Sequence, residues 1–246
     1  MNKALQASLI VQKWPAPTNV RSIQTTRTGG ISTAPYDSFN LGDHANDNPH
    51  HVAHNRQLLS DLVPTEPVWL NQTHGVQVID AALSTCIETA DASFTTNTNI
   101  VCVTMTADCL PVLLCDKAGT VVASVHAGWR GLCDGVIEEV VKSMPVSACE
   151  LMAWLGPAIG PGAFKVSEEV REKFAAQDRQ AVSAFKPHGD KWLGDLYLIA
   201  RQRLQSLGIT GIYGETLCTY SNPDQFFSYR RDGDTGRMAT MIWLSA

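Results

Sequence analysis

Residues 106–131 read TADCLPVLLCDKAGTVVASVHAGWRG and contain two consecutive apolar runs, PVLLCD at 111–116 and TVVASVHA at 120–127. Each run has the length and the Val and Leu content of a buried strand, and the short segment between them predicts a hairpin-like connection. Cys109 precedes the first run and His126 lies near the end of the second. Both side chains are therefore predicted at places where a strand gives way to a turn.

Apolar runs of the same kind recur along the chain and outnumber the helical stretches; they lie at 20–26, 67–72, 76–80, 99–107, 151–159, 211–220, 226–231 and 237–244. Apolar residues spaced by three and four predict helices at 49–62, 131–144, 167–176 and 195–208. The helices fall irregularly among the strands, which argues against a regular βαβ alternation. We therefore predict an α+β fold, with one layered domain over residues 1–246 and large mixed β-sheet or sheets flanked by helices.

Composition narrows the classes of function. The 246 residues are 44% hydrophobic and 17% charged, which is typical of a globular domain. The net charge of -5 and the absence of a run of Lys or Arg disfavour nucleic-acid and membrane-surface partners. The first residues, MNKALQASLIVQKWPAP, make a poor signal peptide and are too short to span a bilayer. An odd count of seven cysteines without an export signal predicts free thiols in a reducing, cytoplasmic compartment.

His74, in LNQTHGVQVI, is a third side chain placed between two β-like runs and followed by glycine. A thiolate with two imidazoles is a zinc-type ligand set, and three protein ligands leave the fourth tetrahedral position for water. The spacing alone lacks the close pairs of ligands that make such a set specific. A buried cysteine with two hydrogen-bonded histidines explains the same residues, so the residues by themselves leave both interpretations open.

Several blocks of the sequence carry a resemblance to a known family. NQTHG, TADCLPVLLCD, VHAGWRG, GPAIGPGAFKV and FFSYRRDGDTGRMATMIW, with TTRTGGIS and PYDSFNLGDH upstream, resemble the YfiH-like family, also called the laccase-domain or multicopper polyphenol oxidoreductase family. The matched blocks run from about Thr25 to Trp243 and so cover nearly the whole chain. Several of them are long enough to be specific.

The resemblance implies a single-domain α+β fold with a zinc ion held by His74, Cys109 and His126. It also implies purine nucleoside phosphorylase activity on adenosine, inosine or methylthioadenosine with phosphate, together with adenosine deamination. The implied partners are a purine nucleoside and inorganic phosphate, and we expect a monomer.

Further residues are candidates for the chemistry. Cys109 and His126 are predicted to be catalytic as well as metal-binding. Asp108, beside the predicted ligand, is the nearest carboxylate for proton transfer, although a carboxylate that caps a turn is an equal alternative. Asn71 and Gln72, in the NQTHG block, are predicted to bind substrate.

Phosphorolysis also needs cations that hold phosphate, and guanidinium groups match phosphate in a bidentate manner. Arg27 and Arg230 are the first candidates, followed by Arg130 and Arg231, and the helix predicted after His126 offers free N–H groups. Trp129 and Phe227 are aromatic candidates for stacking on a purine, and core packing is equally typical of each.

Three other functions compete with this interpretation. A copper-dependent polyphenol oxidase needs many imidazoles, usually in H-x-H pairs, whereas this chain has seven histidines and no H-x-H, so Cu²⁺ is disfavoured against Zn²⁺. A Cys-His hydrolase or amidase would use Cys109 as the nucleophile and His126 as the base, and would need the cysteine free of metal. A zinc-stabilised binding module would need a fourth ligand, and the sequence offers no matching one.

Overall fold

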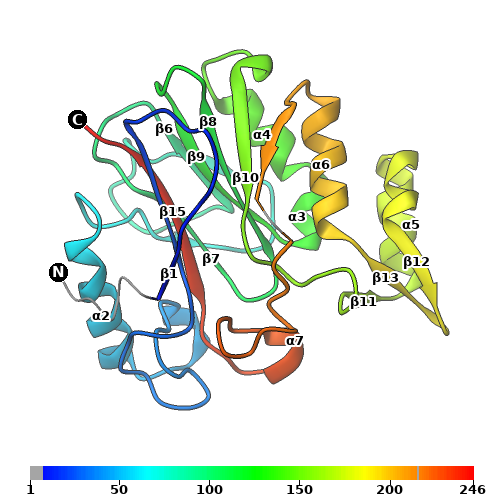
Figure 1. Cartoon of the computed structure of the whole chain (residues 1–246), viewed down its shortest axis with the longest axis horizontal. Coiled ribbons are helices and arrows are strands. Elements are labelled where there is room, and N and C mark those ends of the chain that lie inside the picture. The colour runs from blue at the N-terminus through cyan, green and yellow to red at the C-terminus, as the bar shows by residue number, and fades with distance from the viewer. Residues whose placement is uncertain (1–7, 215) are drawn as a thin grey trace.

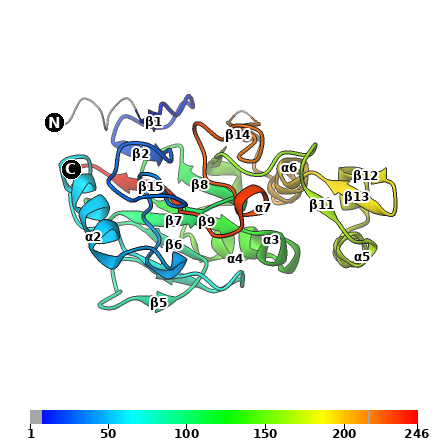
Figure 2. The ribbon, with the colours of Figure 1, turned by 90° about the horizontal axis from the view of Figure 1, so that it is seen from below.

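Two β-sheets packed face to face form the centre of the protein (Figures 1 and 2). The computed structural model describes residues 8–214 and 216–246. The first sheet is antiparallel and has the strand order β1 (Leu9–Ile10), β2 (Val20–Thr25), β15 (Met238–Leu244) and β7 (Cys102–Thr106). The second is mixed and has the order β14 (Gly211–Tyr213), β10 (Leu151–Leu155), β8 (Leu110–Asp116), β9 (Val122–Ala127), β6 (Ala92–Thr95) and β4 (Val78–Asp80).

The pleat of β8 shows how these layers are held together. Successive side chains of a strand point to opposite faces. Leu113 and Cys115 pack in the cluster between the two sheets, while Leu110, Val112 and Leu114 pack in the cluster on the outer face. The run LPVLLCD is apolar on both faces because both faces of the strand are covered, as expected for a strand with no polar alternation.

Helices cover the outer faces of both sheets. The helices α3 (Trp129–Asp134), α4 (Val136–Ser143) and α6 (Leu196–Ser206) contribute to the hydrophobic cluster on the six-stranded sheet. On the four-stranded sheet, Leu59 follows the helix α2 (Pro49–Leu58) in a short 3₁₀ turn and packs with Trp69 and Met241. Figure 2 shows α2 and the group of α3, α4 and α6 on opposite sides of the strands. The order of layers is therefore helix, sheet, sheet and helices.

An arm projects from this body, as Figures 1 and 2 show. It consists of the helix α5 (Glu168–Gln177) and a small antiparallel sheet of β11 (Lys165–Val166), β13 (Lys191–Gly194) and β12 (Phe185–His188). The remaining elements are the parallel pair β3 (Leu70–Asn71) and β5 (Glu88–Thr89), the helix α7 (Tyr229–Asp232), and 3₁₀ turns at Asp43–Ala45, Leu59–Asp61, Ala148–Glu150 and Arg179–Ala184. No helix in the described part of the chain is long and apolar enough to cross a membrane.

The predicted fold class is confirmed, and several predicted elements are corrected. The segment 226–231 is not a strand, because the Ser228 side chain accepts a hydrogen bond from the Arg231 amide at 3.3 Å and caps the short helix α7. The strand predicted at 211–220 ends at residue 213, where Gly214 turns the chain with φ +97°; residue 215 of that prediction lies outside the described residues. Only residues 70 and 71 of the run 67–72 form a strand.

Two helix predictions also need correction, and some elements were missed. The helix expected over 131–144 begins at Trp129 and is split in two by Gly135, whose φ of +102° cannot continue a right-handed helix. The helix expected over 49–62 ends at Leu58 and continues as a 3₁₀ turn. The strands β1, β5 and β6 and the three strands of the arm were not predicted from the sequence. The prediction that the N-terminal segment is a poor signal peptide concerns in part residues 1–7, which lie outside the described residues.

Candidate metal centre and active-site cavity

The hairpin of β8 and β9 brings Cys109 and His126 to the same end of the sheet. Pro111 pairs with His126 and Leu110 pairs with Ala127 in the antiparallel register. Cys109, directly before β8, therefore lies beside the last residues of β9. This is the arrangement that the two apolar runs predict, and the geometry brings the two side chains together although they are distant along the chain.

His74 reaches the same point from the turn between β3 and β4. Its φ is +62°, which is uncommon for a residue other than glycine. One buried carboxylate, that of Asp91, holds this turn: it accepts hydrogen bonds from the amides of Thr73 at 3.2 Å, His74 at 2.8 Å and Gly75 at 2.7 Å. Asp91 was not predicted from the sequence, because nothing in the surrounding residues, ETADASF, marks it as a partner of residues 73–75.

The same carboxylate orients His126. Asp91 Oδ1 lies 2.7 Å from His126 Nδ1, and both side chains are buried. We infer that Nδ1 carries a proton and donates it, so that Nε2 of His126 is the atom that can bind a metal once it is deprotonated. Asp91 thus fixes the positions of two of the three predicted metal ligands, His74 through its amide and His126 through its ring.

The three predicted ligands converge. One ligand atom from each of His74, Cys109 and His126 lies within 4.8 Å of the others, and this is the group of at least three potential ligands in the described part of the chain. His74 Nε2 lies 3.6 Å from Cys109 Sγ. A tetrahedral zinc ion with ordinary Zn–N and Zn–S bonds separates such a pair by about 3.5 Å. The donor set and this distance therefore fit a tetrahedral metal ion.

The neighbouring groups shift the pKa values of Cys109 and His126. Burial alone raises the pKa of the Cys109 thiol, but the charge and hydrogen bonds of His126 and His74 outweigh it and lower the pKa to about 6. Burial lowers the pKa of His126, but Cys109 and Asp91 outweigh it and raise the pKa to about 9. Without metal, the pair is a thiolate beside an imidazolium at neutral pH. Such a pair exchanges one proton for a cation on metal binding.

A glycine packs directly behind the ligands. A Cβ atom on Gly128 would lie 2.7 Å from His74 Cδ2 and 3.0 Å from Cys109 Sγ. Gly131, one turn further along in α3, would meet the Gly75 carbonyl at 2.5 Å. The two glycines of the block HAGWRG therefore let the start of α3 approach the His74 turn closely.

Asp108 lies beside the centre, and both of its carboxylate oxygens accept hydrogen bonds. Oδ1 accepts from the Thr219 hydroxyl at 2.6 Å, and Oδ2 accepts from the Arg230 amide at 2.6 Å, in the first turn of α7. Its φ of +92° is again in the left-handed region. Asp108 therefore joins the metal centre to α7. The proton-transfer role stays a prediction.

A cavity of about 500 Å³ opens onto the three ligands. Of the predicted substrate-binding residues, Gln72, Arg130 and Arg230 line it, and so does the aromatic candidate Trp129. Asp108 also lines it. The full lining is His44, Gln72, His74, Met105, Thr106, Ala107, Asp108, Cys109, His126, Trp129, Arg130, Ile159, Phe164, Leu196, Tyr229, Arg230 and Arg237.

The structure places the other predicted binding residues outside this lining. Arg27 uses all three guanidinium nitrogens elsewhere: Nε donates to the Asp37 carbonyl at 3.0 Å, Nη1 to the Pro223 carbonyl at 2.9 Å, and Nη2 lies 3.3 Å from the Asp37 carboxylate. Asn71 donates to the Thr89 hydroxyl at 3.1 Å. Arg231 is also held, by three backbone carbonyls and by Asp232.

Gln72 lines the cavity, but its side chain is fully engaged. Its Nε2 donates to the Met105 carbonyl at 2.8 Å, and its Oε1 accepts from the Met105 amide at 2.7 Å. The other aromatic candidate, Phe227, is completely buried in the core. Sequence reasoning missed Arg237, His44 and Tyr229. The signal for Arg237 was present, since it lies within the matched block that ends in TGRMATMIW.

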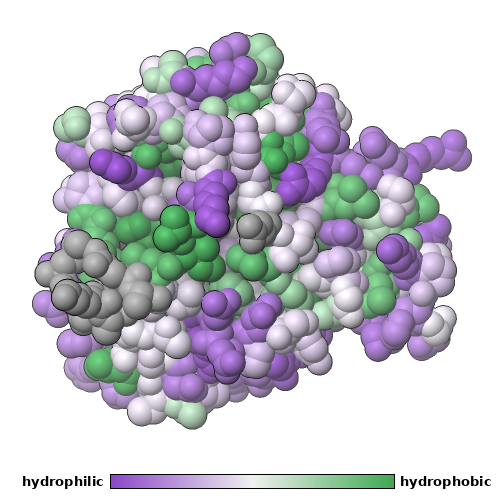
Figure 3. All heavy atoms as spheres, viewed as in Figure 1, coloured by the Kyte–Doolittle hydropathy of each residue, from purple (hydrophilic) through white to green (hydrophobic). Residues whose placement is uncertain are grey.

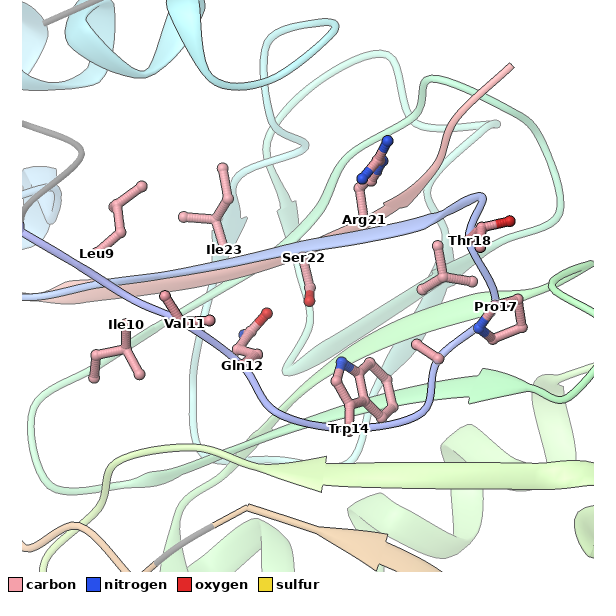
Figure 4. Close-up of a pocket in the computed structure, with 12 residues that line it drawn as sticks. Leu9, Ile10, Val11, Gln12, Trp14, Pro17, Thr18, Arg21, Ser22 and Ile23 are labelled. Atoms are coloured by element: carbon pink, nitrogen blue, oxygen red, sulfur yellow. The ribbon is translucent and has the colours of Figure 1, made fainter. Parts of the chain in front are cut away.

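A second cavity, of about 600 Å³, lies at the N-terminal segment (Figure 4). Residues 11–19 arch away from β2, and most of the lining is apolar; Figure 3 shows a hydrophobic patch over the region of β1. The lining holds one charged side chain, Arg21, and no histidine or cysteine. The cavity is as large as the one at the metal centre, but it lacks groups that perform acid, base or metal chemistry.

Known proteins resemble this chain over nearly its full length. Residues 21–245 match the family described as multi-copper polyphenol oxidoreductase laccase. The chain is 53% identical over 241 residues to the purine nucleoside phosphorylase YfiH of Shigella flexneri, covering 97% of this chain and 99% of that one. The corresponding Escherichia coli protein is 52% identical over 241 residues, with 97% of this chain and 99% of that one covered. A crystal structure of a Neisseria meningitidis protein superposes with a TM-score of 0.95 at 46% identity, covering 97% and 100% of the two chains.

Proposed function

The chain belongs to the family described as multi-copper polyphenol oxidoreductase laccase, and on that basis we propose that it is a zinc-dependent purine nucleoside phosphorylase that also deaminates adenosine. Relatives at 53% and 52% identity carry the name purine nucleoside phosphorylase. We further propose that the protein works in the cytoplasm as a monomer, with a purine nucleoside and phosphate as partners. The family match confirms the family to which the sequence blocks pointed.

One observation carries the proposal: the His74, Cys109 and His126 side chains converge on a cavity that also holds arginines and aromatic rings. Trp129 and Phe164 provide flat apolar surfaces of the kind on which a purine stacks. Arg130, Arg230 and Arg237 provide positive charge for an anion. A cavity with both features suits a substrate that is part purine and part phosphate.

The three ligands fit a zinc ion, with Cys109 as thiolate and the two histidines neutral. When bound, the ion supplies a positive charge that polarises a purine substituent and favours ionisation of water at neutral pH. Two imidazoles and a thiolate also suit copper, so the ligand set by itself does not separate the two metals. We propose zinc because the described residues contain this one group of three ligands, whereas a multicopper oxidase needs further imidazole clusters.

In phosphorolysis, a phosphate oxygen forms a bond to C1′ of the ribose while the bond from C1′ to the purine nitrogen breaks. The electron pair of the broken bond stays on the purine, which takes up a proton, and the sugar leaves as ribose 1-phosphate. We propose that an arginine of the cavity binds the phosphate and neutralises its charge as it approaches C1′. Trp129 and Phe164 hold the purine, and the cavity walls limit competing attack by water.

In deamination, water adds to C6 of adenine and ammonia leaves, so a group is needed that takes a proton from the water and passes one to the departing nitrogen. We propose that Asp108 does this, because it is the carboxylate that lines the cavity beside Cys109. Its hydrogen bonds from Thr219 and the Arg230 amide hold it in place for the role. Each oxygen accepts one hydrogen bond and so keeps a second lone pair for a proton.

A Cys-His hydrolase is the second candidate, because one geometric observation favours it. Cys109, His126 and Asp91 form a chain of nucleophile, base and orienting carboxylate, as in the catalytic triads of hydrolases. His74, aimed at the same thiol from the other side at 3.6 Å, favours the metal site over this candidate. The hydrolase would be active without metal, whereas the zinc enzyme would be inactive without it.

The test is a product assay on the purified protein with adenosine, run with and without phosphate, and with zinc present or removed by a chelator. We expect free adenine only with phosphate, inosine regardless of phosphate, and neither product after zinc removal. Adenine release at equal rates without phosphate would indicate hydrolysis and contradict the phosphorylase proposal. Ester or amide hydrolysis that survives chelation and is blocked by alkylation of Cys109 would support the hydrolase instead.

A further inference from the structure

Besides the three predicted metal ligands, the cavity lining includes two groups of residues of different character, which we call the apolar wall and the polar wall. Trp129, Ile159, Phe164 and Leu196 all belong to or pack against the hydrophobic cluster on the outer face of the six-stranded sheet. The polar wall comes from β7, the residue after β3, the residue before β15 and the 3₁₀ turn Asp43–Ala45; its members are His44, Gln72, Met105, Thr106 and Arg237. A bound purine nucleoside and an anion would therefore prefer different walls.

Arg237 is the cation of the polar wall, and two of its three guanidinium nitrogens have no partner among the described residues. Nη1 donates to the Thr235 carbonyl at 2.6 Å and to the Gly236 carbonyl at 3.0 Å. Among the described residues, Nε and Nη2 have no hydrogen-bond partner. These two nitrogens form one edge of the guanidinium plane, which is the edge geometry that binds two oxygens of a phosphate.

Arg237 is half-buried and lies among acidic groups. Burial lowers the pKa of Arg237, while the negative charges of Cys109, Tyr229, Asp108 and Tyr36, when ionised, favour its charged form. A guanidinium remains charged at any physiological pH. A partly desolvated cation with two unused nitrogens attracts an anion more strongly than one that is fully hydrated.

The other arginines near the cavity are less suited to this role. Arg130 and Arg230 are exposed, and their guanidinium groups lie over the rings of Trp129 at 4.5 Å and Phe164 at 5.7 Å. They therefore belong to the apolar wall. Arg27, which the sequence analysis ranked first, has no free nitrogen unless its contacts with Asp37 and Pro223 break.

A second group on the polar wall also lacks a partner. Thr106 lines the cavity and is 1% exposed, and its hydroxyl is buried without a hydrogen-bond partner among the described residues. Thr106 pairs with Met238, the residue after Arg237, in the ladder between β7 and β15. An unsatisfied buried hydroxyl costs stability, and because this hydroxyl has almost no accessible surface, a ligand in the cavity would accept its hydrogen bond after the side chain turns toward the cavity.

We propose that Arg237, through Nε and Nη2, and the Thr106 hydroxyl bind the phosphate co-substrate on the polar wall, while the rings of the apolar wall hold the purine. This inference rests on the proposed phosphorolysis and assigns its phosphate site. It moves the site from the first candidates, Arg27 and Arg230, to a residue that was not predicted from the sequence. Arg130 and Arg230 then serve the nucleoside, above the rings of the apolar wall.

The test uses the zinc-loaded full-length protein and inorganic phosphate as the probe. The variants are Arg237→Lys, which keeps the charge and loses the bidentate edge, and Thr106→Val, which keeps the shape and removes the hydroxyl. The matched control is Arg21→Lys at the N-terminal cavity. Phosphate binding is followed without nucleoside by ³¹P line broadening, and the KM for phosphate and for adenosine is measured separately.

We expect Arg237→Lys to raise the phosphate KM at least about 30-fold and Thr106→Val about 5-fold, with the adenosine KM within about twofold of the parent. Zinc content should stay at the parent level, and Thr106→Val should be at least as stable as the parent because it removes an unpaired polar group. Arg21→Lys should behave as the parent in every measurement. A role of Arg237 in folding alone would lower stability and leave the phosphate KM unchanged.

The outcomes separate this inference from the proposed function. Phosphate-dependent cleavage with an unchanged phosphate KM in both variants would overturn the inference and leave phosphorolysis standing. ³¹P broadening that needs Arg237, in a protein that cleaves no nucleoside, would keep the anion site and overturn the phosphorolysis. The binding of adenosine 5′-monophosphate is measured as well. If Arg237→Lys weakens the binding of this nucleotide and leaves the binding of free phosphate unchanged, the site serves a nucleotide phosphate and the inference fails.

Discussion

A buried carboxylate that accepts several hydrogen bonds lies at each end of the β8–β9 hairpin, but the two carboxylates have different roles. At the closed end, the buried carboxylate of Asp116 accepts hydrogen bonds from the Thr120 amide at 2.6 Å, the Thr120 hydroxyl at 2.8 Å and the Val121 amide at 3.0 Å. At the open end, Asp91 accepts from the amides of the His74 turn and from the His126 ring. In both places several hydrogen-bond donors favour the ionised form of a buried carboxylate.

The difference lies in what each carboxylate holds. All partners of Asp116 are within five residues, so it stabilises a turn that the chain would make locally. The partners of Asp91 are 16 to 35 residues away, and two of them, His74 and His126, are proposed metal ligands. Hydrogen bonds to nearby residues close a turn, whereas hydrogen bonds to distant residues bring a side chain from a turn and one from a strand to a common point. Function at this site therefore depends on Asp91 in a way that it does not depend on Asp116.

The largest expected effect comes from removing the thiolate at the open end. Cys109→Ala leaves two histidines, which hold zinc poorly, so the metal content should fall from about one per chain to below about 0.1. Cys115→Ala is the matched control, since this buried cysteine of the same strand β8 packs between the sheets. Elemental analysis of both proteins checks the prediction. Stoichiometric zinc in Cys109→Ala would overturn the ligand assignment.

The next effect sharpens the comparison between the two carboxylates. Asp91→Asn should weaken zinc binding about 10-fold to 100-fold, because an amide replaces the carboxylate that accepts the His126 Nδ1 proton. Asp116→Asn should leave zinc affinity within about twofold of the parent. Competition with a chelator of known affinity measures both. Equal losses in the two variants would mean that stability of the hairpin, and not ligand orientation, controls the metal site.

The fold could be predicted largely from local patterns. Both strands of the hairpin are apolar on two faces and read as buried runs, and their pairing follows from the short connection. The strands of the arm were missed because β11 is only two residues long, β12 carries mostly exposed side chains, and β13 has one buried residue in four. The run FFSYRR has strand-like composition, but Ser228 competes by capping a helix turn, and the capped turn wins.

The site was predictable only in part, for a physical reason. His74, Cys109 and His126 were chosen because their residue types are metal ligands and because the blocks around them resemble a family. Asp91 and Arg237 act through partners that are far away in sequence, and a single sequence does not reveal such pairs. Arg27 shows the converse, since its position after a strand looked suitable while Asp37 and Pro223 occupy its guanidinium.

Gly128 offers a smaller perturbation of the open end. In Gly128→Ala the new Cβ would lie 2.7 Å from His74 Cδ2 and 3.0 Å from Cys109 Sγ, so at least one ligand must shift. We expect zinc affinity to fall about 10-fold, without loss of the fold. Gly162→Ala is the matched control, because a Cβ there meets nothing within 4 Å. The same chelator competition applies, and an unchanged affinity in Gly128→Ala would show that the ligands tolerate the displacement.

The smallest expected effect is at the closed end and depends on pH. Burial raises the pKa of Asp116, but the hydrogen bonds from Val121 and Thr120 outweigh it and lower the pKa below the ordinary value. A group whose pKa is depressed in the folded state adds stability above its unfolded pKa of about 3.9, and that stability is lost as the pH falls through the folded pKa.

Asp116→Asn should therefore lower the free energy of unfolding by about 2 kcal/mol at pH 7, as for hydrogen bonds to a charged acceptor. The difference from the parent should shrink as the pH falls below about 4, because the parent then loses the same charge. Urea unfolding of both proteins between pH 7 and pH 3 measures this. A constant difference across that range would mean that the amide disturbs the turn by its shape, and the ionised carboxylate would no longer explain the stability of this end. The contrast with Asp91 would then rest on metal affinity alone.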